Sequence, residues 1–151
     1  MKVDQLIAKA DIMINATVDV VWEALTNPDK LKLFMFGSTV KSNWIKGSPI
    51  TWEGEWQGKP YKDKGKILEV VPNKKLQYSH FSPLSGAEDK PENYHTVTIE
   101  LQQKGNQTSV QLTQDKNETE EEKQHSQKNW EMMLTNLKKV VEKQHAVDAQ
   151  S

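Results

Sequence analysis

The chain has 151 residues and a formal net charge of −1, so its length fits one domain that can bury a core without disulfides. All 20 basic residues are lysine and no cysteine occurs. This composition disfavours a nucleic-acid partner and excludes disulfides, thiolate metal sites and cysteine nucleophiles.

The N-terminal segment also argues against secretion. Asp4 and Asp11 stand where a signal peptide needs an unbroken apolar stretch, and no later segment is long and apolar enough to span a bilayer. We therefore expect a cytoplasmic protein that does not insert into membranes.

The first third of the chain predicts one strand and two short helices. Apolar residues alternate with polar ones from Leu6 to Ile14, which is the period of a half-buried strand. Thr17 can cap a following helix through its hydroxyl, and Asn27-Pro28 ends that helix. A second helix is expected from Pro28 to about Phe34.

The middle of the chain predicts a run of antiparallel strands. Ile50, Trp52, Gly54 and Trp56 alternate with polar residues, so two indoles share one face and a gap lies beside the glycine. Further strands are expected at 61–71, 76–80, 94–101 and from about 107, the last two joined by a hairpin at Gly105-Asn106. The longer loop from Ser82 to Asn93 is typical of a functional or mobile segment.

A long amphipathic helix closes the sequence. Thr119 and Glu122 form a capping box at its start. Its apolar stripe consists of Trp130, Met133, Leu134, Leu137, Val140 and Val141. We expect residues 1–143 to form a single domain and the polar residues 144–151 a disordered tail.

This order of elements resembles the helix-grip fold of START-like and birch-pollen-allergen-like (SRPBCC) proteins. The segments Asn15–Pro28, Gly65–Pro72 with Leu76–Tyr78, and the helix around Asn129-Trp130 are similar to bacterial homologues of the activator of the ninety-kilodalton heat-shock protein ATPase. The resemblance implies an α+β fold, with an antiparallel sheet of six to seven strands curved round the long helix. It identifies a fold rather than a reaction, because the superfamily includes lipid carriers, receptors, cyclases and oxygenase domains.

The strand alternation predicts which side chains face the long helix. They form a mostly apolar lining with a few polar groups, as in small-molecule sites, although the same stripe could simply fill a solid core. The predicted ligand-binding residues are Trp52, Trp56, Tyr78, His80, His95, Val97, Trp130, Met133 and Leu137.

His80 and His95 are the most specific chemical feature. If the strands on either side of the 82–93 loop pair symmetrically, the two imidazoles lie opposite each other at the loop end of the cavity. They could be a simple rim pair, could orient a ligand or act as acid or base, or could bind zinc with a third ligand. The strand carboxylates Glu53, Glu55, Asp63 and Glu69 are interpreted as solvated faces.

Three functions are compatible with these features. The first is a non-enzymatic protein that binds a hydrophobic or amphipathic small molecule, such as a lipid, without catalytic residues, metal or cofactor. The second is a cyclase or hydrolase that uses His80 or His95, and the third is a module that binds a chaperone through its surface. We expect a monomer or weak dimer.

Overall fold

A computed structural model describes residues 6–35, 37–83, 86 and 88–150, without the side chains of Trp56 and of residues 144–150. In chain order its elements are β1 (Leu6–Ile14), α1 (Val18–Thr26), α2 (Pro28–Phe34), β2 (Thr39–Ser42), β3 (Pro49–Trp56), β4 (Lys59–Val71), β5 (Lys75–His80), η2 (Pro91–Asn93), β6 (His95–Lys104), β7 (Gln107–Asn117) and α3 (Glu120–Gln150).

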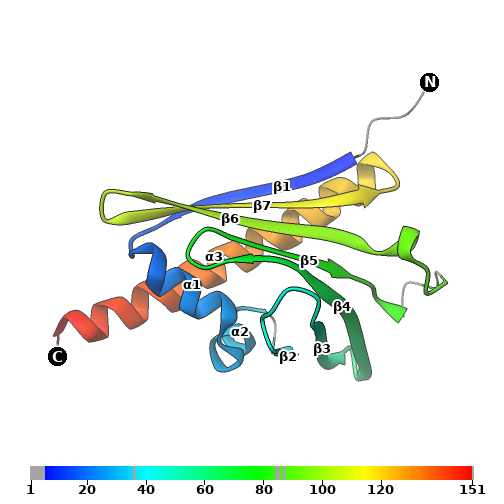
Figure 1. Ribbon diagram of the computed structural model, residues 1–151, viewed down its shortest axis with the longest axis horizontal. Coiled ribbons are helices and arrows are strands. Elements are labelled where there is room, and N and C mark those ends of the chain that lie inside the picture. The colour runs from blue at the N-terminus through cyan, green and yellow to red at the C-terminus, as the bar shows by residue number, and fades with distance from the viewer. Residues whose placement is uncertain (1–5, 36, 84–85, 87, 151) are drawn as a thin grey trace.

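The strands form one antiparallel sheet of seven strands in the order β1-β7-β6-β5-β4-β3-β2. Figure 1 shows the sheet curving round α3, with α1 and α2 beside the C-terminal half of that helix. The predicted α+β helix-grip architecture is therefore confirmed.

The core lies between the sheet and the apolar stripe of α3. Met133, Leu134, Leu137 and Val141 are each at most 2% exposed, so the stripe predicted from helical spacing faces the sheet. Their partners include Ile14, Ile67, Leu76, Val97, Ile99, Val110 and Leu112 from five strands. Trp22, which the stripe of α1 places against this core, is partly buried there.

Two helix starts differ in how their backbone N–H groups are satisfied. At α3, the Thr119 hydroxyl accepts a hydrogen bond from the Glu122 amide at 3.0 Å, which confirms the predicted cap. At α1, the Thr17 hydroxyl donates instead to Oδ1 of Asp19 at 2.5 Å and makes no cap bond, so that prediction was wrong. The nearby carboxylate competes successfully for the hydroxyl.

The helical backbone of α3 continues to Gln150. Disorder of residues 144–151 stays a prediction. Among the described residues, no helix combines the length and the apolar character needed to cross a bilayer.

The gap expected beside Gly54 is filled. A Cβ built on Gly54 would lie 2.7 Å from Oη of Tyr61, because the tyrosine ring on β4 crosses over this glycine. The free space lies instead beside Trp52 and Asp63, between the sheet and α3.

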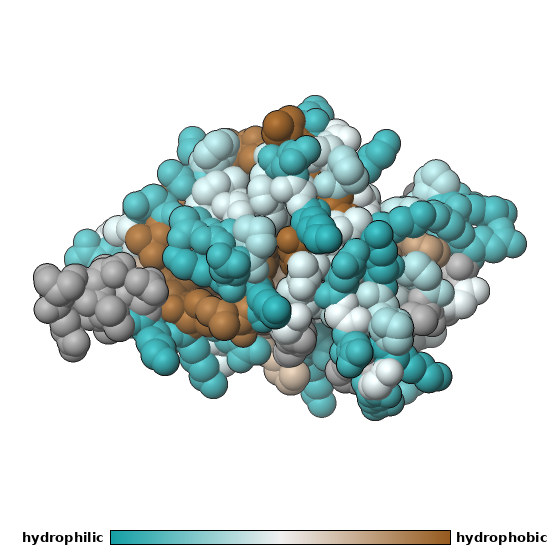
Figure 2. Space-filling view, turned by 90° about the horizontal axis from the view of Figure 1, so that it is seen from below, coloured by the Kyte–Doolittle hydropathy of each residue, from teal (hydrophilic) through white to brown (hydrophobic). Residues whose placement is uncertain are grey.

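Hydrophilic residues cover most of the face seen from below, where apolar residues show in separate areas (Figure 2). The exposed large apolar side chains include Leu33 on α2, Ile45 before β3 and Met132 on α3. Scattered apolar residues of this kind are normal on a protein surface.

Candidate functional site

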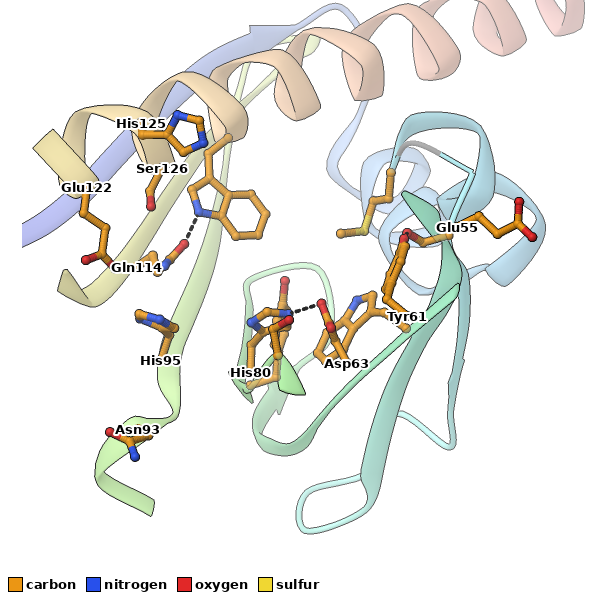
Figure 3. Close-up of a pocket in the computed structure, with 16 residues that line it drawn as sticks. Glu55, Tyr61, Asp63, His80, Asn93, His95, Gln114, Glu122, His125 and Ser126 are labelled. Atoms are coloured by element: carbon orange, nitrogen blue, oxygen red, sulfur yellow. Dashed lines mark hydrogen bonds and ion pairs between the residues drawn. The ribbon is translucent and has the colours of Figure 1, made fainter. Parts of the chain in front are cut away.

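A cavity of about 580 Å³ lies between the first half of α3 and the sheet. Figure 3 shows β6, β7 and α3 on one side of it and β3 and β4 on the other. Its volume falls in the usual range of small-molecule sites. The lining residues are Met35, Ser38, Trp52, Glu55, Tyr61, Asp63, Tyr78, His80, Ser82, Asn93, His95, Gln114, Glu122, His125, Ser126 and Trp130.

The register of the sheet positions the central side chains. Residue 80 on β5 pairs with residue 95 on β6, and Tyr78 pairs with Val97, so the predicted symmetric pairing is confirmed. On the other side of the cavity, Trp52 on β3 pairs with Asp63 on β4. Directly paired residues point to the same face of a sheet. The pair His80–His95 and the pair formed by Trp52 and Asp63 therefore both face the cavity.

Five of the nine predicted binding residues line this cavity: Trp52, Tyr78, His80, His95 and Trp130. Val97, Met133 and Leu137 are buried in the core and do not line it. The side chain of Trp56 lies outside the described part of the chain. Whether the five residues bind a ligand stays a prediction.

Asp63 is the main addition to the predicted site. Its carboxylate is 16% exposed, and Oδ2 lies 2.9 Å from Nε2 of His80. The expectation that Asp63 belongs to a solvated face was therefore wrong. A signal was present in the sequence: Lys62, Lys64 and Lys66 alternate with it, which puts Asp63 on the opposite face together with the buried Ile67.

The two histidines have distinct hydrogen-bond roles. The His95 Nδ1 atom lies 2.8 Å from the backbone oxygen of Asp115, which can only accept. His95 therefore carries a proton on Nδ1, and in the neutral ring Nε2 is an acceptor. By the same reasoning the Asp63 carboxylate requires the His80 proton on Nε2, and in the neutral ring Nδ1 is the acceptor.

Other polar groups are held by neighbouring elements. Trp130 Nε1 on α3 donates to Oε1 of Gln114 on β7, which fixes the indole at the cavity wall. The hydroxyls of Tyr61 and Ser38 form a hydrogen bond of 2.5 Å. The sequence offered no pairing signal for these contacts, because they join elements far apart in the chain.

The aromatic side chains form a connected wall. The Trp52 ring centroid lies 5.2 Å from that of Tyr78 and 4.9 Å from that of His80, both typical of aromatic pairs. Burial raises the pKa of Tyr78, so its phenol stays neutral at physiological pH. The wall is thus apolar and uncharged behind the Asp63–His80 pair.

The zinc alternative lacks a third ligand in the described residues. No group of three or more histidine, aspartate or glutamate side chains there is arranged to hold a metal ion. His80 instead has Asp63 as its partner.

A curved antiparallel sheet round a long helix defines the helix-grip class of proteins, and this member has a cavity of ligand size between the sheet and the helix. The chain belongs to the family of Activator of Hsp90 ATPase homolog 1-like proteins, whose model matches residues 15–142. No curated protein shows significant similarity to it.

Solved structures agree with this assignment. The solution structure of ChR145 from Cytophaga hutchinsonii is 53% identical, with a TM-score of 0.83, and the match covers 97% of this chain and 99% of that one. The solution structure of the Aha1 dimer from Colwellia psychrerythraea is 25% identical, with a TM-score of 0.70, covering 89% of this chain and 95% of that one.

Proposed function

We propose that the protein binds an amphipathic small molecule in the cavity between α3 and the sheet. The observation that carries this proposal is the cavity of about 580 Å³, whose wall combines the rings of Trp52, Tyr78 and Trp130 with many polar side chains, as an amphipathic ligand requires. Apolar and aromatic surface supplies most of the binding free energy of such a ligand, and polar groups at defined positions orient it. His80, Asp63 and His95 supply that orientation here.

Native mass spectrometry of the protein purified from cells tests the proposal first. A co-purifying mass that leaves on denaturation would identify the ligand. A titration with lipids and metabolites, followed by tryptophan fluorescence, should then show saturable quenching. A clean apo mass together with flat titrations would contradict the proposal.

A matched pair of variants connects binding to this cavity. Trp130→Leu removes an indole from the cavity wall, whereas Trp22→Leu removes a partly buried indole on α1 that does not line it. We expect Trp130→Leu to weaken binding at least tenfold and Trp22→Leu to leave it within twofold. Equal losses in the two variants would indicate a general effect on the fold.

An enzymatic function is the second candidate, favoured by the hydrogen bond between Asp63 and His80. A carboxylate that fixes the tautomer of a histidine is a common arrangement in general acid–base catalysis. The test is to incubate the protein with the co-purified ligand and to measure whether a product forms. The rate of product formation should then show a bell-shaped dependence on pH. His80→Ala should abolish conversion while weakening binding far less; an unchanged molecule after long incubation would contradict catalysis.

A chaperone-binding module is the third candidate, suggested by the family description, Activator of Hsp90 ATPase homolog 1-like protein. In this case the surface would act and the cavity would be incidental. The ATPase rate of the cell's Hsp90-type chaperone should rise on addition of the protein. No change in rate and no co-purification in a pull-down would count against it.

A further inference from the structure

The charges on the cavity wall are unevenly distributed. Glu55, Asp63 and Glu122 line it together with three histidines, and among the residues that the structure describes no lysine does so. This is notable in a chain with 20 basic and 21 acidic residues. Lys64, Lys66 and Lys116 line a separate cavity of about 530 Å³ instead. An anionic headgroup would therefore meet three carboxylates in the first cavity, and protonated imidazoles would be its positively charged partners among the described lining residues.

Asp63 also has an unused acceptor. Its Oδ2 atom is bonded to His80, but Oδ1 is buried and accepts no hydrogen bond from any described residue. A buried carboxylate oxygen without a donor is costly, so such an atom calls for an external partner. Oδ1 has almost no accessible surface, so a ligand donor reaches it only when the Asp63 side chain turns toward the cavity. A ligand N–H or O–H group would then satisfy it, and a positively charged donor would do so most strongly.

Two aromatic residues are neighbours of this carboxylate in the sheet. Trp52 is the direct cross-strand partner of Asp63, and Tyr61 lies two residues before Asp63 on the same face of β4. Figure 3 shows Asp63 and Tyr61 close together on the β3–β4 side of the cavity. Indole and phenol faces attract cations, and the attraction is greater away from water.

We propose that the cavity selects a protonated amine carried on an apolar body. In this arrangement the ammonium group donates to the Asp63 carboxylate and lies against the Trp52 wall, while the apolar body extends toward Trp130. The inference rests on the proposed binding function and names the class of its ligand. It also specifies that fatty acids and phosphate esters are poor ligands of this cavity.

Three probes that share one body test the selection: 1-naphthylmethylammonium, 1-naphthylmethanol and 1-naphthoate. Their dissociation constants would be measured by calorimetry at pH 7, with the Trp130 indole N–H signal in NMR spectra marking occupation of this cavity. We expect the ammonium probe to bind at least tenfold more tightly than the alcohol, and the carboxylate to bind most weakly.

Asp63→Asn identifies the group responsible. This substitution should raise the dissociation constant of the ammonium probe about tenfold and change that of the alcohol less than twofold. Binding of the alcohol therefore also shows that the variant is folded. Glu53→Gln is the matched control, because Glu53 is on β3, does not line the cavity and pairs with Lys62. This control should leave both constants unchanged.

The outcomes separate the two proposals. If none of the three probes shifts the Trp130 signal, and no cellular ligand co-purifies, the binding function itself fails. If the alcohol or carboxylate binds as tightly as the ammonium probe, binding stands and amine selection is overturned. Amine selection that survives Asp63→Asn would overturn the role of Asp63.

Discussion

At Gly65 the backbone of β4 lies too close to β5 to leave room for a side chain. A Cβ built on this residue would lie 1.7 Å from the backbone oxygen of Ser79. Backbone cannot move aside as a side-chain end can, so any larger residue must displace one of the two strands. These strands carry Asp63 and His80, which makes Gly65 a determinant of the site as well as of the fold.

Gly65→Ala should therefore destabilise the protein by about 3 kcal/mol, near the upper end of overpacking effects. Gly54→Ala is the comparison, because its new Cβ meets only the outer end of the Tyr61 ring, which can rotate away at the cost of its hydrogen bond with Ser38. We expect a loss of about 1 kcal/mol there. Urea denaturation measures both, and equal losses would show that the close approach at Gly65 relaxes without cost.

The residues on the two sides of the cavity differ in how well the sequence predicts their positions. His80 and His95 could be paired in advance because a single loop joins their strands, and symmetric pairing is the simplest register. Asp63 was misassigned because lysines precede and follow it, although their regular alternation places it inside. Hydrogen bonds such as that of Trp130 with Gln114 depend on rotamers, which strand period does not determine.

Among the elements, α3 is tied to the start of the chain by one carboxylate. Oε2 of Glu142 accepts a hydrogen bond of 2.8 Å from the Asn15 amide, between β1 and α1, and is paired with Lys138. Burial raises the pKa of Glu142, but the bonds from Lys138 and Asn15 and the charge of Lys138 outweigh it and lower the pKa below 4.5.

Glu142→Gln should accordingly lower the free energy of unfolding by about 1 kcal/mol at pH 7. Because the folded-state pKa is depressed, this contribution is complete above about pH 4.5 and is lost as the pH falls through the folded value. The difference between wild type and variant should thus narrow toward pH 3. Glu131→Gln, on the exposed face of α3, is the control and should show no such difference.

Helices and strands were predictable where one period extends over many residues, as in β1 and α3. The starts of β4, β5 and β6 lie one or two residues from the predicted ones, since the last pairs of a ladder depend on the neighbouring strand rather than on local pattern. The short strand β2 was not predicted, because four residues are too few to show a period. The Thr17 cap failed because Asp19 offers a second acceptor within the same turn.

At the scale of the whole molecule, the cavity reflects how α3 is supported. The helix lies closest to β1, β7, α1 and α2, whereas the parts of β3 and β4 that carry Trp52 and Asp63 face it across the cavity in the described part of the chain. Sequence period shows that both surfaces are partly apolar but cannot show the distance between them. The position of the cavity therefore had to come from the structure.

This unequal support predicts unequal opening of the sheet. The amides of β3 and β4 should exchange with deuterium at least tenfold faster than those of β6 and β7, a difference of about 1.4 kcal/mol in opening free energy. An amine ligand that bridges Asp63 and Trp130 would connect the two walls, so it should slow exchange in β3 and β4 while hardly changing β6 and β7. Trp130→Leu should remove the slowing, and Trp22→Leu should retain it. Uniform exchange along the sheet before ligand is added would show that β3 and β4 are as well supported as the strands beneath α3.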